Sequence, residues 1–382
     1  MKCKLQEIVD VTMGQSPKSE YYNTDGKGYP FLQGNRTFGF KYPSFDTYTT
    51  VMTKPAKAGD VIMSVRAPVG DLNITPVDMC LGRGVCSLRM KNGNQSFLYY
   101  MMKYYVPHLL KKESGTVFGS VNRNDINGLE VDIPEDEQIQ RRIARYLEMI
   151  DEKIELNNAI NNNLAEQSQA IFTEFMDCYP YKLTPLGDMA EIIDCLHSKK
   201  PEAVSDTTLQ LLQLNNITDS GFLDLSLKYY ISKSDYDNWT RKCEIVEGDC
   251  VITNVGRIGA VSQAPVGTHA AMGRNMTCIR LKKDKPFHSY LITALLSNHI
   301  RKEIMKNTDE GTIMGALNVK NIPLLLFPVF ETSVMVQLEN ILSPIRKTIE
   351  QNYLSNQTLT QTRDTLLPKL MSGELDVSDI DL

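Results

Sequence analysis

The feature that most constrains this chain is an internal repeat. The string GTVFGSVN begins at Gly115, and the similar string GTIMGALN begins at Gly311. Four further segment pairs recur in the same order: KLQEIVDVTMGQSP with PLGDMAEIIDCLHSKKP, PFLQGN with LLQLNN, AGDVIMSVRAPVGD with EGDCVITNVGRIGA, and CLGRGVCSLR with AMGRNMTCIR. Self-similarity at one long spacing indicates duplicated structural units, so the sequence predicts two tandem units of roughly 190 residues each.

Each unit has the same order of expected elements. A short amphipathic helix opens each unit, over 5–12 and 186–194. Apolar runs bounded by glycine turns follow, DVIMSV and GVCSLRM or DCVITNV and MTCIRL, and such runs are typical of strands. Next come a helix (SFLYYMMKYYVPHLLKK or SYLITALLSNHIRKEIMK), the Gly-Thr string, and LEVDIP or LLLFPV. This order predicts an α+β fold with a mostly antiparallel sheet in each unit.

Each unit also ends in a heptad stripe, with spacings mostly of four and three. The first stripe runs through Ile139, Ile143, Leu147, Ile150, Ile154, Asn157, Asn161, Leu164, Ser168, Ile171 and Phe175. The second runs through Val334, Leu338, Leu342, Ile345, Ile349, Asn352, Asn356, Leu359, Arg363, Leu366 and Leu370. This period predicts two coiled-coil helices of roughly 40 residues, about 60 Å each. Pro344 and Pro368 predict a kink or fraying in the second.

One helix cannot bury its own stripe, so we expect the two helices to pack together as an antiparallel coiled coil. The chain would then be a pseudo-twofold dumbbell of two related α/β domains. The expected segments are a first domain at 1–134, a first spacer helix at 135–177, a second domain at 178–333, a second helix at 334–373 and an acidic tail at 374–382. The paired asparagines are either tolerated polar seam residues or a device that fixes the register of the helices.

Composition narrows the class of protein. The net charge is −5, but the last nine residues, ELDVSDIDL, hold four acids and no base, so the body is close to neutral. It lacks the strong positive field of a protein that holds DNA alone. The eight cysteines form no CxxC pair and no zinc-spaced cluster with histidine, so we expect reduced thiols and no metal site. The start has no apolar leader, and no run of about 18 apolar residues occurs, which predicts a cytoplasmic protein.

The ordered set of motifs resembles the specificity subunit of type I restriction-modification systems, which act in host defence. The resemblance rests on GQSPKSEYYN, LQGN, AGDVIMSVRAPVGD, GRGVCSLR, GTVFGSVNRNDI, IPEDEQIQRRIARYLEMIDEKIELNN and LPKLMSGELD, and it covers essentially the whole chain. It implies that each globular unit is a target recognition domain for one half of a bipartite DNA site. It also implies that the helices space the halves and dock two methyltransferase (M) subunits.

The resemblance further implies double-stranded DNA and restriction/translocase (R) subunits as partners. No cofactor is implied for this chain, because S-adenosylmethionine, ATP and Mg would be bound by the partner subunits. Two similar but non-identical readers suit an asymmetric site, with halves about one turn of B-DNA, roughly 34 Å, apart.

Polar residues of the loops are the candidate DNA contacts, because Arg pairs with guanine, Asn or Gln with adenine, and Lys with phosphate. In the first unit they are Gln15, Ser16, Lys18, Gln33, Asn35, Arg36, Arg66, Asn122 and Arg123. In the second they are Ser198, Lys199, Lys200, Gln213, Asn215, Asn216, Asn254, Arg257, Asn275, Asn318 and Lys320. Arg83 and Arg274 occupy the same position of both repeats, which favours a structural or phosphate-binding role over base reading. The Gly-Thr strings are interpreted as loops whose glycines allow close packing, either against the start of a helix or against the DNA backbone.

No P-loop, cofactor-binding glycine loop or Pro-Pro-aromatic methylation motif occurs. We therefore expect a non-catalytic subunit without catalytic residues, whose partners carry adenine N6-methylation and ATP-dependent DNA cleavage. Two alternatives remain. One is a protein-docking coiled-coil scaffold that does not read DNA. The other is the specificity subunit of a methylation-only system.

Overall fold

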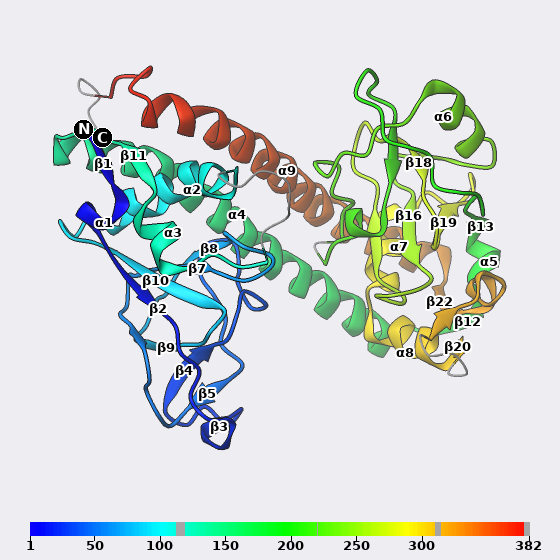
Figure 1. The fold of residues 1–382 in the computed structure, drawn as a ribbon. Coiled ribbons are helices and arrows are strands. Elements are labelled where there is room, and N and C mark those ends of the chain that lie inside the picture. Colours follow the sequence, from blue (N-terminus) through cyan, green and yellow to red (C-terminus); the bar gives the residue numbers. More distant parts are fainter. Residues whose placement is uncertain (112–118, 220, 310–314, 378–382) are drawn as a thin grey trace. The chain divides into compact units, whose positions relative to one another are not determined.

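The computed structural model describes residues 1–111, 119–219, 221–309 and 315–377 (Figure 1). Contacts divide the chain into two compact units. Unit 1 is formed by Met1–Ile154 with Thr358–Leu382, and unit 2 by Glu155–Gln357. Among the described residues, no helix has the length and apolar character needed to cross a membrane.

Unit 1 is built on an antiparallel sheet of order β2-β10-β7-β8, with bounds Val9–Met13, Val85–Met90, Val61–Ser64 and Leu72–Ile74. A second sheet, β3-β5-β4-β9-β6, comprises Tyr22–Asn23, Tyr48–Thr49, Tyr29–Leu32, Met79–Leu81 and Pro55–Ala56. The short strands β1 (Lys2–Lys4) and β11 (Glu130–Asp132) pair with each other. The helices are α1 (Leu5–Ile8), α2 (Gln95–Lys111) and α3 (Arg123–Asn127), with a 3₁₀ turn η1 at Ser19–Tyr21.

The core of unit 1 lies between α2 and the β2-β10-β7-β8 sheet. Phe97 and Met101 of α2 are fully buried with Val61 and Leu88 of the sheet. Leu147 and other residues from the two long helices complete the same cluster, namely Ile143, Ala144, Leu367, Leu370 and Met371. Burial of this apolar surface is the main force that holds the helices on the sheet.

Unit 2 contains the sheet β13-β19-β16-β17, with bounds Ala190–Asp194, Met276–Leu281, Cys250–Thr253 and Val261–Gln263. The sheet β14-β18-β15 comprises Gln210–Leu212, His269–Met272 and Glu244–Val246, and the two strand pairs are β12 (Tyr181–Pro185) with β22 (Leu326–Phe330) and β20 (Thr308–Asp309) with β21 (Ala316–Leu317). The remaining elements are α5 (Leu186–Met189), α6 (Lys233–Trp239), α7 (His288–Leu295), α8 (Asn298–Lys306), η2 (Leu214–Asn216) and η3 (Val319–Leu324).

The two units repeat one topology, which confirms the duplication and the α+β fold. The main sheets have equivalent strand orders, and one parallel pair recurs, β4 with β9 and β14 with β18. An ion pair between an arginine and a buried aspartate recurs as well. Arg89 donates to Asp60 at 2.7 Å, and Arg280 donates to Asp249 at 2.8 Å. The Gly-Asp dipeptide shared by the two repeats, Gly59-Asp60 and Gly248-Asp249, therefore has a structural role.

Two expected helices differ from the structure. The helix expected over 5–12 ends at Ile8, and β2 begins at Val9, because Val9 and Val11 alternate into the core with the period of a strand. The second unit repeats this, with α5 ending at Met189. The run SYLITALLSNHIRKEIMK forms two helices, because the Ser297 hydroxyl accepts from the Ile300 N–H and caps the start of α8.

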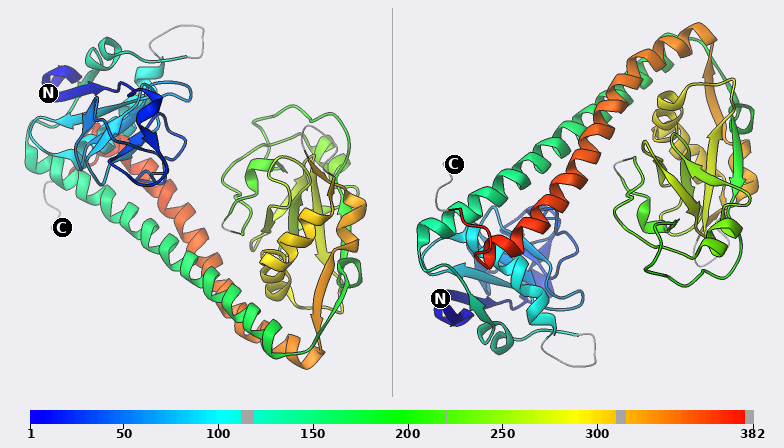
Figure 2. Two further views of the ribbon diagram at one scale, coloured as in Figure 1. Left: turned by 90° about the horizontal axis from the view of Figure 1, so that it is seen from below. Right: turned by 90° about the horizontal axis from the view of Figure 1, so that it is seen from above.

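Both expected long helices are present (Figure 2). Helix α4 spans Glu137–Cys178, 42 residues, and α9 spans Thr332–Met371, 40 residues. Helix α9 runs without interruption through Pro344 and Pro368. Seven of the predicted seam residues are buried, namely Ile143, Leu147, Ile154, Asn157, Leu338, Leu342 and Ile349. Three more are half-buried, namely Ile150, Ile345 and Asn352.

The asparagines of the stripes bond to one another within unit 2. Asn157 donates to Asn356 at 2.8 Å, and Asn352 donates to Asn161 at 2.9 Å. Asn157 is equivalent to Asn352 in the repeat and Asn161 to Asn356, so each bond is the local twofold counterpart of the other. The helices are antiparallel here, and the paired bonds favour the register-fixing interpretation. The dumbbell arrangement and the domain bounds stay predictions.

Candidate nucleic-acid interface

Three loops of unit 1 meet through hydrogen bonds donated by main-chain N–H groups. The Gly82 N–H donates to the Leu32 carbonyl at 2.7 Å, and the Arg83 N–H donates to the Ser16 hydroxyl at 3.1 Å. A Cβ at Gly82 would lie 2.6 Å from the Gln33 Cα, so only glycine permits this approach. The contact brings together residues 14–18, 33–36 and 82–84, which we call the three-loop cluster of unit 1. It assembles Gln15, Gln33 and Arg83 from three distant stretches of sequence.

Unit 2 repeats this arrangement with residues 195–200, 213–216 and 273–275, the three-loop cluster of unit 2. A Cβ at Gly273 would lie 2.1 Å from the Leu212 carbonyl oxygen. The Asn254 N–H donates to the Asn275 carbonyl at 2.9 Å, as Val65 does to Gly84 in unit 1 at 2.9 Å. The turn between β18 and β19 is therefore fixed in the same way as the turn between β9 and β10.

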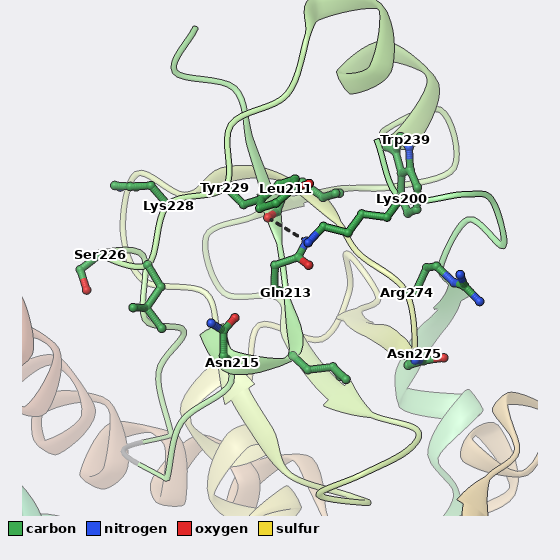
Figure 3. A pocket seen from close by; sticks show the side chains of 12 residues that line it. Lys200, Leu211, Gln213, Asn215, Ser226, Lys228, Tyr229, Trp239, Arg274 and Asn275 are labelled. Atoms are coloured by element: carbon green, nitrogen blue, oxygen red, sulfur yellow. Dashed lines mark hydrogen bonds between the residues drawn. The ribbon is translucent and has the colours of Figure 1, made fainter. Parts of the chain in front are cut away.

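The cluster of unit 2 surrounds a cavity of about 690 Å³ (Figure 3). Its lining includes four predicted DNA contacts, Lys200, Gln213, Asn215 and Asn275. Gln33 and Arg36 line a smaller hollow of about 280 Å³ at the equivalent place in unit 1. Both hollows follow equivalent strands, β4 and β14, so the repeat carries a polar recess at a fixed position.

Several predicted contacts are exposed with free side chains. Within the ranges that the structure describes, no hydrogen-bond or ion-pair partner occupies the side chains of Gln15, Gln33, Arg66, Ser198, Lys199, Asn215, Asn275 and Lys320. The Lys200 ammonium lies 3.7 Å from the centroid of the Tyr229 ring. The Gln213 amide donates to the Leu212 carbonyl at 3.1 Å. Lys18 is exposed and lies 3.8 Å from Glu20, while the half-buried Ser16 accepts from Arg83.

The prediction is wrong for Asn216 and Asn254. Asn216 is fully buried, and its side chain accepts from the Gln213 N–H and donates to the Asp224 carbonyl, both at 2.6 Å. Asn254 is also buried, and its side chain donates to the Leu317 carbonyl and accepts from Thr277, both at 3.0 Å. These amides satisfy main-chain groups in the interior and cannot reach a base.

Four other predicted contacts would have to exchange a protein partner for DNA. In unit 1, Asn35 donates to Asp71, and Arg36 pairs with Asp46. Arg123 donates to the Val11 carbonyl. In unit 2, Arg257 pairs with Asp219 and donates to the Ile217 carbonyl.

The described ends of the Gly-Thr strings are helix caps. Asn122 accepts from the Asn124 N–H at 2.8 Å at the start of α3, and Asn318 accepts from the Lys320 N–H at 3.0 Å at the start of η3. Capping explains why both repeats end this string in asparagine. Residues 115–118 and 311–314 of the strings, and 378–382 of the acidic tail, lie outside the described residues.

Two groups of potential metal ligands occur in the described part of the chain: Asp194, Cys195 and His197, and Cys243, Asp249 and Cys278. Sequence spacing did not reveal the second, because its members come from separate strands. Asp249 is already paired with Arg280 and raises the pKa of that guanidinium. Contact with Cys243 and burial raise the pKa of the Cys278 thiol. The neighbouring guanidinium and the protonated Cys278 thiol disfavour a bound cation here.

The sequence did not predict the aromatic part of the unit 2 recess. Tyr229 and Trp239 line the recess, and so does Arg274. The sequence KYY before Ile231 and the single tryptophan in an otherwise polar stretch were the available signals.

Comparison with known proteins finds similarity to one family. A sequence model described as "Type I restriction modification DNA specificity domain" matches residues 1–166. A putative type I restriction enzyme MjaX specificity subunit of Methanocaldococcus jannaschii is 35% identical over 168 residues, covering 44% of this chain and 39% of that relative. The MjaIX specificity subunit of the same organism is 21% identical, covering 99% and 94%. The HindI specificity subunit of Haemophilus influenzae is 22% identical, covering 84% and 88%.

A solved structure shows the same fold. The S subunit of a type I restriction-modification system from M. genitalium aligns with a TM-score of 0.57 at 16% identity, over 97% of this chain and 95% of that chain.

Proposed function

Because residues 1–166 match the type I restriction modification DNA specificity domain, we propose that this chain is a type I specificity subunit whose two units each read one half of an asymmetric, bipartite DNA site. The helices α4 and α9 set the unread gap between the halves and dock two M subunits. R subunits complete the assembly when restriction is present. The chain itself is non-catalytic, and S-adenosylmethionine, ATP and Mg are bound by its partners.

One observation carries this proposal. A duplicated fold presents, at the same place in each unit, a cluster of loops rich in exposed Gln, Asn, Arg and Lys side chains. Bidentate amides and guanidinium groups are the side chains that read base edges, and lysines neutralise phosphates. In unit 2 the cluster holds Lys200, Gln213, Asn215 and Asn275 around one recess. A protein-docking scaffold would not require such a cluster in both units.

The experiment that tests the proposal is a single-molecule methylome of cells with and without this gene, with M-subunit expression verified. We expect a methyl-adenine motif of two different short halves around a fixed gap, present only with the gene. The absence of any gene-dependent motif, together with no salt-dependent duplex binding by the assembled complex, would favour the scaffold alternative.

The near-neutral body predicts weak duplex binding by the chain alone, with M subunits supplying most of the contacts to the DNA backbone. Nanomolar, site-specific binding by the isolated chain at physiological salt would contradict this. Exchange of residues 1–133 for those of another family member should change one half-site only. Deletion of four residues from α4, about one turn, should shorten the gap or abolish activity.

A further inference from the structure

We infer that Arg83 and Arg274 are equivalent phosphate anchors, one in each unit, that hold DNA without reading its sequence. The inference rests on the proposed DNA-reading function and assigns a role to residues within its two clusters.

The first argument is the fixed position of both residues. Arg83 and Arg274 each follow a glycine whose Cα lies too close to a neighbouring loop to carry a side chain. The Gly84 N–H also donates to the Gln33 carbonyl at 2.9 Å, so the unit 1 turn is bonded on both sides of its arginine. A guanidinium on such a turn loses less backbone entropy on binding than one on a mobile loop.

The second argument is charge. Arg36, Arg89, Arg257 and Arg280 are each paired with an aspartate. Arg83 and Arg274 are exposed, and no acid pairs with either one within the described ranges. An uncompensated guanidinium presents a planar set of donors suited to a phosphate group. Each unit thus carries one such cation on its fixed turn.

The third argument is which features the units share. Units that read different half-sites face different bases but the same sugar-phosphate backbone. A residue placed identically in both therefore suits the backbone, because phosphate contacts position a protein and base contacts specify the sequence. The next residue in the turn differs. Unit 1 has Gly84, without a side chain, whereas unit 2 has Asn275, which lines the recess with a φ of 62°.

The variants that test this are Arg83→Gln, Arg274→Gln, the double variant, and the matched control Asn275→Gly. The glutamines remove charge but keep a polar side chain. Glycine tolerates a φ of 62° and converts the unit 2 turn into the Gly-Arg-Gly turn of unit 1, so the control should fold. Each is assembled with M subunits, and duplex binding is measured against salt on a target and a non-target sequence. The methylated motif is determined in parallel.

Each Arg→Gln change should lower the slope of log K against log salt by about 0.9, equally on both duplexes, and leave the motif unchanged. The double variant should lose about twice as much. Asn275→Gly should keep the slope and relax one base position in a single half-site.

An unchanged slope, or an altered base in the motif of either arginine variant, would overturn the anchor role. If the wild-type complex binds neither duplex and yields no motif, the proposed function fails as well. If the wild-type complex reads DNA normally and the arginine variants behave like it, only the anchor role is refuted and the proposed function stands.

Discussion

The ion pair between α9 and α4 in unit 1 should be a stringent test of how the long helices are held. Asp151 is fully buried and Arg363 is 7% exposed. The Arg363 Nη1 lies 2.8 Å from Asp151 Oδ1, and the Tyr100 hydroxyl donates to the other oxygen at 2.8 Å. Arg363→Met keeps most of the side-chain volume but leaves a buried carboxylate without its cation, which costs about 3–5 kcal/mol.

A second substitution separates charge from packing. Asp151→Asn removes the buried charge, while its oxygen still accepts from Tyr100. The double variant, Arg363→Met with Asp151→Asn, should therefore lose only about 1–2 kcal/mol of stability, which is the cost of one or two unmade hydrogen bonds. The double variant should therefore be about 2–3 kcal/mol more stable than Arg363→Met alone.

The assay exploits the single tryptophan, Trp239, which lies in unit 2. Urea unfolding of unit 1 is followed by hydrogen exchange of peptides from α2, and Trp239 fluorescence reports unit 2 in the same samples. We expect protection of α2 to fall in Arg363→Met and to recover in the double variant, with a much smaller change in the tryptophan transition. A loss below about 1 kcal/mol in Arg363→Met, or no recovery in the double variant, would refute the reasoning.

Three further predictions concern other sites. The double change Asn157→Leu with Asn356→Leu should leave unit 2 at least as stable as the wild type but weaken the specification of helix register. The methylated motif should then show more than one gap length, and a single unchanged gap would contradict this. Burial lowers the pKa of Lys103 from 10.5 to about 8, so its charge destabilises the fold fully below pH 8 and not above 10.5. Lys103→Met should raise the melting temperature at pH 7, with the gain lost as the pH rises from 8 to 10.5, and a gain that does not depend on pH would argue against the charge. Gly273→Ala should destabilise unit 2 by about 2–3 kcal/mol in urea titrations followed by Trp239 fluorescence, because backbone atoms meet the new Cβ; wild-type stability would show that the turn can shift.

The fold was predictable where its pattern is local and repeated. The heptad stripes predicted α4 and α9 because helix periodicity extends over many turns in both copies. The segment after Leu5 was assigned wrongly because a four-residue helix and a strand share one apolar stretch, and the alternation of Val9 with Val11 was the competing signal. The pairing of β4 with β9 joins strands far apart in sequence, and no local pattern specifies it.

The site was predictable at the level of loops and less so at the level of side chains. Gln213, Asn215 and Asn275 do surround one recess, because turn-forming polar residues gather where strands end. Asn216 and Asn254 look the same in sequence, but tertiary carbonyls placed by distant segments take up their amides. Which asparagine serves the interior depends on those partners and not on its neighbours in the chain.

The composition of unit 1 from both ends of the chain has a consequence for synthesis. Leu370, Met371 and Val377 belong to the same core as Leu5 and Val61, although the ribosome makes them after the whole of unit 2. All of unit 2, Glu155–Gln357, is translated in between. Unit 1 therefore begins to emerge before unit 2 but completes its core after it. A premature stop near residue 358 would release a chain in which unit 2 is entire and unit 1 still exposes apolar surface. Cellular quality control can distinguish such a product from the finished protein.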